Sequence, residues 1–174
     1  TASLITNKGS NKINAFECGS SGKGWDKLIV RNNFFDVRKK KSEEKSYGKG
    51  NIYTDDHLFM DGPAIYEFTI KEIPGLINRV MEKNKLTEDQ IHKFIPHQAN
   101  AFLLKSICTF SNINKEKLFL NLDNYGNTVS STIPIALKEY SRSLTEKTVL
   151  NILLAGFGVG LSWSAGILNL KNKL

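Results

Sequence analysis

A nearly continuous apolar run at residues 149–157 (VLNILLAGF) is the feature that most restricts the fold of this chain. A strand with one solvated face alternates apolar and polar residues, whereas a run without alternation is typical of a strand covered on both faces. A glycine-rich turn at residues 158–160 follows, and a final strand begins at residue 161. The run therefore predicts a sheet with other elements packed on both of its faces.

The residues before this run predict helices and strands in alternation. Apolar residues at helical spacing from residue 62 to residue 84 predict a long helix, with a kink or a break near Ile73 because Pro74 lacks an N–H group. The sequence TEDQ at residues 87–90 fits a capping box and predicts a short helix. A short strand is then expected to end at His97.

Three further helix starts and one further strand are expected between this strand and the apolar run. Asn100 is a favoured N-cap, and two more starts are predicted at residues 114–117 and at residues 130–132, which precede Pro134. Residues 118–122 predict a strand. The order of elements indicates the α/β class, with a mixed sheet covered by helices and a closing β-hairpin. The apolar residues expected on the helix after Asn100 are Leu103, Ile107 and Phe110.

The N-terminal third carries weaker patterns. Residues 2–6 and 12–16 predict two short strands, separated by a turn. The glycine-rich segment at residues 19–24 lacks the residue order of a phosphate-binding loop and predicts another turn. Residues 36–56 are polar and charged, and we expect them to form an excursion on the surface.

Composition argues against several classes of function. The 24 basic and 17 acidic residues give a net charge of +7, but the densest basic run, at residues 38–41, has no interleaved aromatic residues of the kind that bind nucleic acid. Two cysteines cannot build a four-cysteine zinc site, and the three histidines lack metal-ligand spacing, so we expect no metal. No apolar run is long enough to span a bilayer. We therefore expect a cytoplasmic protein without membrane contact.

His97, Asn127 and the turn at residues 158–160 each follow a predicted strand. Ligands of open, helix-covered sheets bind where the loops at strand ends converge. A neutral imidazole N–H and a carboxamide N–H aimed at one oxygen would stabilise a developing enolate or oxyanion. Taken singly, each segment also has a structural interpretation, because histidines often flank strands and asparagine and glycine favour turns.

Three motifs in this region share an order with a known family. They are IPHQAN at residues 95–100, GNT at residues 126–128 and GFGVGLSW at residues 156–163, and FMDG at residues 59–62 precedes them. In this order they resemble the histidine motif, the asparagine motif and the glycine-rich hairpin in the C-terminal half of β-ketoacyl-acyl carrier protein synthase III, a thiolase-like condensing enzyme.

The resemblance implies a thiolase-like fold and a decarboxylative Claisen condensation that initiates fatty acid biosynthesis. A cysteine takes an acyl group from acyl-CoA, and the enolate from malonyl-acyl carrier protein attacks it. His97 and Asn127 would hold the malonyl thioester oxygen, and the backbone N–H of Val159 would bind the oxyanion. The resemblance also implies a homodimer and no cofactor beyond the coenzyme A or phosphopantetheine that carries the substrate. The further substrate-binding residues that it implies are Asn100, Phe157 and Gly158.

The chain departs from the family in several places. The nucleophilic cysteine of the family precedes the region covered here, and neither Cys18 nor Cys108 lies at a helix N-terminus that would lower its pKa. We therefore expect the chain alone to be inactive and to need a missing N-terminal half. Val159 replaces a glycine of the family, Phe102 replaces a basic residue that docks the carrier protein, and Pro63 replaces an asparagine near the pantetheine. The sequence therefore does not determine which acyl group is used or which carrier delivers it.

Two alternatives also stay open. One is a related acyltransferase of a surface-polysaccharide or secondary-metabolite pathway, and the other is a non-catalytic half-domain that binds a coenzyme A or carrier-protein arm. In each case residues 1–57 are expected to contain the end of the N-terminal half and a linker. Residues 58–174 are expected to form the C-terminal thiolase-like domain.

Overall fold

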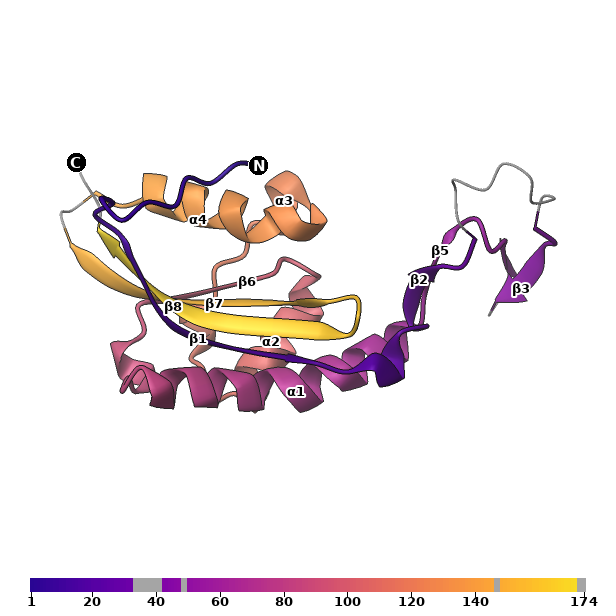
Figure 1. Ribbon diagram of the computed structural model, residues 1–174, viewed down its shortest axis with the longest axis horizontal. Coiled ribbons are helices and arrows are strands. Elements are labelled where there is room, and N and C mark those ends of the chain that lie inside the picture. The colour runs from indigo at the N-terminus through magenta and orange to yellow at the C-terminus, as the bar shows by residue number, and fades with distance from the viewer. Residues whose placement is uncertain (33–41, 48–49, 146–147, 172–174) are drawn as a thin grey trace.

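A mixed sheet with helices on both faces forms the body of the molecule (Figure 1). The computed structural model describes residues 1–32, 42–47, 50–145 and 148–171. The strand order is β1-β8-β7-β6, with bounds Lys12–Ser20, Ser162–Lys171, Val149–Gly158 and Lys93–Pro96 in that order. β8 is antiparallel to both of its neighbours, whereas β6 runs parallel to β7. The expected α/β class and the closing hairpin of β7 and β8 are confirmed.

The apolar run of β7 is covered from both sides, as its sequence predicts. Helices α1 (Gly62–Lys83) and α2 (Ala101–Phe110) lie on one face of the sheet, and α4 (Thr132–Arg142) lies on the other (Figure 1). Leu153 is buried with the α1 and α2 side chains, and its neighbour Ile152 is buried with Ala136 of α4. Successive side chains of a strand point to opposite faces, so one strand contributes to two separate apolar cores.

A kink or a break is expected near Ile73, and the break is wrong, because helix α1 continues through Pro74. Proline removes one helical hydrogen bond, but here the residues around it anchor the helix on the sheet. Ile73 and Ile77 are both fully buried in the core. The burial of such side chains contributes roughly 1.5–3 kcal/mol each, which outweighs the preference of an isolated segment to bend.

The strand predicted at residues 118–122 is reduced to an isolated parallel bridge between Phe94 and Leu118. After this bridge, the buried side chain of Gln98 forms the hydrogen bonds that a paired strand would otherwise form. It donates to the Phe119 carbonyl and accepts from the Asn121 N–H. Leu122 then begins the short helix α3 (Leu122–Tyr125) rather than ending a strand. A glutamine side chain replaces strand pairing at this edge.

Most of the other predicted starts are confirmed. The side chain of Asn100 caps α2, and Asn114 caps the 3₁₀ helix η3 (Lys115–Lys117). Of the apolar residues expected on α2, Leu103 and Ile107 are buried, but Phe110 is exposed. The other short 3₁₀ helices among the described residues are η1 (Gly22–Gly24), η2 (Glu88–Gln90) and η4 (Val129–Ser131).

The N-terminal segment departs from its prediction. Residues 2–6 form no strand, whereas the strand predicted at residues 12–16 is the longer β1, which pairs with β8 in the main sheet. An excursion leaves the body after β1 (Figure 1). It contains β2 (Leu28–Val30) paired with β5 (Leu58–Met60), and β3 (Lys45–Tyr47) paired with β4 (Asn51–Tyr53).

The basic run at residues 38–41 and part of the polar stretch at residues 36–56 lie outside the described residues. The division of the chain after residue 57 stays a prediction. In the parts of the chain that the structure describes, no helix is long and apolar enough to cross a membrane.

Candidate active site

His97 directly follows β6, which ends beside Ala155 of the parallel strand β7. Pro96 pairs with Ala155, and the His97 N–H donates to the Ala155 carbonyl at 2.7 Å. The half-buried imidazole ring meets the Phe157 ring edge-on, with 5.6 Å between the ring centroids and 81° between their planes. The histidine motif and the glycine-rich hairpin are therefore in contact.

Thr132, the first residue of α4, is a partner of His97 that the sequence analysis missed. Its Oγ1 lies 2.7 Å from His97 Nδ1 and 2.9 Å from the Val129 carbonyl oxygen. Thr132 is only 3% exposed, so water does not compete for its hydroxyl. The only sequence signal at this position was a helix start, which does not distinguish a capping residue from one that holds a catalytic side chain.

Burial lowers the pKa of His97 below its ordinary value, and a hydrogen bond with the Val129 backbone opposes this shift. Desolvation penalises the charged form of an imidazole, which keeps it neutral near pH 7. A neutral imidazole has one N–H donor and one acceptor nitrogen. The hydrogen bond at Nδ1 therefore decides what Nε2 can do.

Asn127 is held with its amide group free to donate. Its Oδ1 accepts a hydrogen bond from the Val129 N–H at 2.9 Å, which leaves the Nδ2 hydrogens for a ligand. Gly126 turns the chain from α3 towards Asn127 with φ +62° and ψ −158°, a conformation that is essentially restricted to glycine. Asn127 itself is exposed.

Val129 connects the two side chains. Its N–H donates to Asn127, and its carbonyl accepts from the backbone N–H of Thr132, whose hydroxyl lies beside His97 Nδ1. Val129 has a φ of +55°, which is unfavourable for a β-branched residue. A continuous path of hydrogen bonds thus joins the asparagine motif to the histidine motif, and the Phe157 contact adds the hairpin. The structure brings all three motifs together.

Val159 lies in the turn between β7 and β8 and is 60% exposed. The positive φ of this turn belongs to Gly160, at +129°, so a β-branched side chain at Val159 causes no backbone strain. Two reciprocal backbone hydrogen bonds of 2.8 Å join Ser21, just after β1, to Leu161. The turn is therefore fixed to the neighbouring strand directly after the position of Val159.

Two further positions, Gly158 and Asn100, complete the predicted set. Gly158 ends β7 beside this turn, and a Cβ added there would meet no heavy atom within 4 Å. Asn100 caps α2, because its Oδ1 accepts a hydrogen bond from the Leu103 N–H at 2.8 Å. Its Nδ2 is therefore the group that could donate to a ligand. On the same helix, Phe102 is 70% exposed and stacks on Tyr66, with 5.6 Å between their ring centroids.

Neither cysteine is placed as an activated nucleophile. Cys108 is buried in α2, and burial raises the pKa of its thiol to about 11. A thiol with this pKa stays protonated near pH 7, and the thiolate is the reactive form. Cys18 is exposed within β1 rather than at a helix N-terminus.

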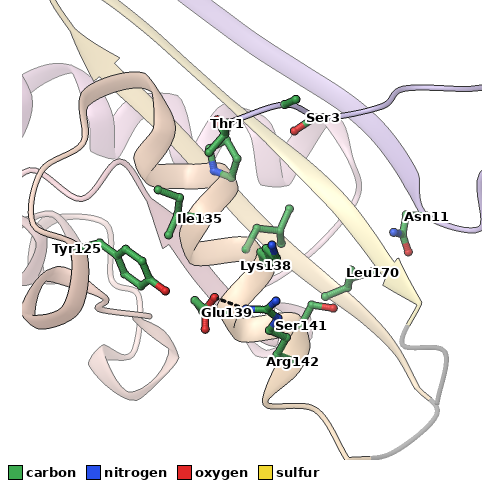
Figure 2. Close-up of a pocket in the computed structure, with 13 residues that line it drawn as sticks. Thr1, Ser3, Asn11, Tyr125, Ile135, Lys138, Glu139, Ser141, Arg142 and Leu170 are labelled. Atoms are coloured by element: carbon green, nitrogen blue, oxygen red, sulfur yellow. Dashed lines mark hydrogen bonds and ion pairs between the residues drawn. The ribbon is translucent and has the colours of Figure 1, made fainter.

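A separate hollow of about 510 Å³ lies between α4 and the N-terminal segment (Figure 2). Tyr125 and Lys138 line it, as does an ion pair between Glu139 and Arg142. None of the predicted site residues lines this hollow. Among the residues that the structure describes, no group of three or more His, Cys, Asp or Glu side chains is placed to hold a metal ion.

Comparison with known families agrees with this arrangement of motifs. The protein-family model described as the C-terminal domain of 3-oxoacyl-[acyl-carrier-protein (ACP)] synthase III matches residues 81–170, which is more than half of the chain. The chain belongs to this family. The residues predicted for the site all lie within the matched span of this synthase III C-terminal domain: His97, Asn100, Asn127, Phe157, Gly158 and Val159.

Relatives and solved structures support the assignment. The β-ketoacyl-[acyl-carrier-protein] synthase III of Clostridium tetani is 30% identical over 96% of this chain and 50% of its own length. The enzyme of the same name from Acholeplasma laidlawii is 38% identical over 69% of this chain and 38% of its own length. A crystal structure of a 3-oxoacyl-(acyl-carrier-protein) synthase III has a TM-score of 0.80 and 34% identity, over 91% of this chain and 48% of that one.

The synthase III structure from Thermus thermophilus has a TM-score of 0.74 at 26% identity, over 94% of this chain and 48% of that one. The expected thiolase-like fold is thereby confirmed. This chain spans about half the length of the curated synthase III relatives that it matches, or less.

Proposed function

We propose that this chain forms the decarboxylating half of the active site in a 3-oxoacyl-acyl carrier protein synthase III. A hydrogen-bonded path from Asn127 to His97 carries the proposal. Asn127 accepts from the Val129 N–H, and the Val129 carbonyl accepts from the Thr132 N–H. The Thr132 hydroxyl then contacts His97. This path orients two side chains from separate loops in one region. Two donors held in advance around one oxygen stabilise the charge that develops on it.

In the proposed reaction, a cysteine thiolate attacks an acyl-CoA, and coenzyme A leaves as the acyl-enzyme forms. A malonyl thioester on the carrier protein then loses carbon dioxide. Loss of carbon dioxide leaves the electron pair of the broken C–C bond in an enolate, whose negative charge is shared by the thioester oxygen. His97 Nε2–H and Asn127 Nδ2–H donate to this oxygen. The enolate carbon attacks the acyl-enzyme, the Val159 N–H donates to the oxyanion, and the cysteine leaves as a thiolate.

The nucleophile must come from a part of the enzyme outside these residues. The buried Cys108 thiol has a raised pKa, and Cys18 lies within a strand, so neither has the environment of an activated thiolate. We therefore propose that residues 1–174 alone do not form an acyl-enzyme. No cofactor takes part beyond the coenzyme A or phosphopantetheine that carries each substrate.

The test measures the two half-reactions separately in the complete protein. His97→Ala and Asn127→Ala should each lower the rate of carbon dioxide release from malonyl-acyl carrier protein about 10²- to 10³-fold, because one oxyanion donor contributes roughly 3 kcal/mol. Acylation of the cysteine by acyl-CoA, followed by intact mass, should change little. His57→Ala is the matched control, because His57 is exposed and bonds to Thr54 in the excursion.

Two results would overturn the proposal. Equal loss of acylation and decarboxylation in His97→Ala would remove the assigned role of this residue. If the complete protein neither releases carbon dioxide nor forms an acyl-enzyme, the proposed synthase activity is excluded. In that case, coenzyme A binding measured by calorimetry would support the alternative of a non-catalytic domain that binds the carrier arm.

A further inference from the structure

The Thr132 hydroxyl lies between two groups that compete for its single proton. Its Oγ1 is 2.7 Å from His97 Nδ1 and 2.9 Å from the Val129 carbonyl oxygen. A hydroxyl has one donor hydrogen and two acceptor lone pairs. Thr132 can therefore donate to only one of these groups at a time.

The direction of this bond fixes the tautomer of a neutral His97. If Thr132 donates to the Val129 carbonyl, its oxygen accepts from Nδ1–H, and Nε2 keeps a lone pair. The hydrogen bond between the imidazole and the Val129 backbone also competes for an imidazole proton. If Thr132 donates to Nδ1, the imidazole proton resides on Nε2. Only the second arrangement gives the site a neutral imidazole that donates through Nε2.

The Val129 carbonyl does not depend on the Thr132 hydroxyl. The backbone N–H of Thr132 also donates to this carbonyl, in the 3₁₀ turn that begins α4. Rotation of the hydroxyl towards Nδ1 therefore leaves the carbonyl with a partner, whereas a buried carbonyl without one would cost free energy. The edge-on contact with Phe157 holds the His97 ring, so Nδ1 keeps facing Thr132.

We propose that Thr132 is a positioning residue that donates its hydroxyl proton to His97 Nδ1 and thereby keeps the imidazole in the Nε2–H tautomer. This inference rests on the proposed function, in which Nε2–H binds the thioester oxygen. Burial keeps the imidazole neutral. The choice between tautomers therefore decides whether His97 is a donor or an acceptor.

The first test is the rate of carbon dioxide release by the complete protein. Thr132→Val keeps the shape of the side chain but removes the hydroxyl, and it should lower kcat about tenfold or more while KM stays unchanged. Thr132→Ser should restore most of the rate, because it restores the donor. Cysteine acylation should be unaffected in both variants.

Thr69→Val is the matched control for the loss of a buried hydroxyl. Thr69 is 0% exposed, and its hydroxyl donates to the Ile65 carbonyl at 2.7 Å within α1, a helix that carries none of the predicted site residues. This variant should keep the full rate. If Thr69→Val and Thr132→Val lose equal activity, the effect is one of stability, and the positioning role is excluded.

The second test reads the tautomer directly by ¹⁵N NMR of the imidazole. Unmodified protein should show His97 protonated at Nε2, and Thr132→Val should show a mixture of tautomers. An Nδ1–H tautomer in the unmodified protein, or an unchanged tautomer and rate in Thr132→Val, would overturn the inference. If His97→Ala abolishes decarboxylation and Thr132→Val does not affect it, the inference fails but the proposed function stands.

Discussion

Replacing Gly126 by alanine tests whether the backbone conformation before Asn127 builds the site. A Cβ at this position would meet no heavy atom within 4 Å, so the cost of the substitution comes from the backbone alone. Residue 126 has φ +62° and ψ −158°, a region that costs a residue with a Cβ about 1–3 kcal/mol. The lower entropy of the unfolded alanine chain offsets about 0.4–1 kcal/mol. The net loss of unfolding free energy should therefore be roughly 1–2 kcal/mol.

Urea unfolding of the complete protein, followed by circular dichroism, measures this difference. Gly62→Ala is the control, because Gly62 also has open space around its added Cβ but has no positive φ. The control should be neutral or slightly stabilising at the start of α1. The reasoning is refuted if Gly126→Ala is no more destabilising than Gly62→Ala. The rate of malonyl decarboxylation should also fall in Gly126→Ala, because the turn directs Asn127.

Three further predictions follow from single positions. Val129→Asn should raise the unfolding free energy by about 1 kcal/mol, because asparagine tolerates a positive φ, and the same change at the strand residue Val149 should not. In the folded protein a thiol reagent should label the exposed Cys18 and spare Cys108, whose pKa is raised by burial; rapid labelling of Cys108 would contradict its placement. Because the pKa of His97 is lowered in the folded state, the unfolded state binds more protons below about pH 6.5, and the free energy of unfolding falls as the pH falls through the folded pKa. His97→Gln removes this group, so its free energy of unfolding, measured with urea, should fall less between about pH 7 and pH 5 than that of the unmodified protein.

Local patterns in the sequence predicted the elements whose causes are themselves local. The apolar run gave β7, and asparagines placed before helical segments gave the caps of α2 and η3. The polar residue after each strand also marked His97 as a candidate before any geometry was known. These features depend on a few neighbouring residues, and so the residues themselves carry the information.

The failures share a different cause, namely contacts between distant segments. Pro74 predicts a kink or a break, but no break occurs, because the residues around it pack on the sheet and maintain the helix. Residues 118–122 predict a strand, but a side chain from residue 98 takes the backbone groups that the strand would use. The bond between Thr132 and His97 joins residues 35 positions apart. The periodicity of a sequence reports only on neighbouring residues, so a contact between distant residues is seen only in the folded structure.

The pair of hydrogen bonds between Ser21 and Leu161 has a consequence for where this protein can be divided. The family match begins at residue 81, yet the strand at Lys12–Ser20 closes one edge of the sheet, and Ser21 just after it holds the turn that carries Val159. A piece cut at the start of the family match would expose the edge of β8 and release this turn, and an exposed edge strand promotes association with other chains. The smallest portion that preserves the site is therefore longer than the portion that the family model matches.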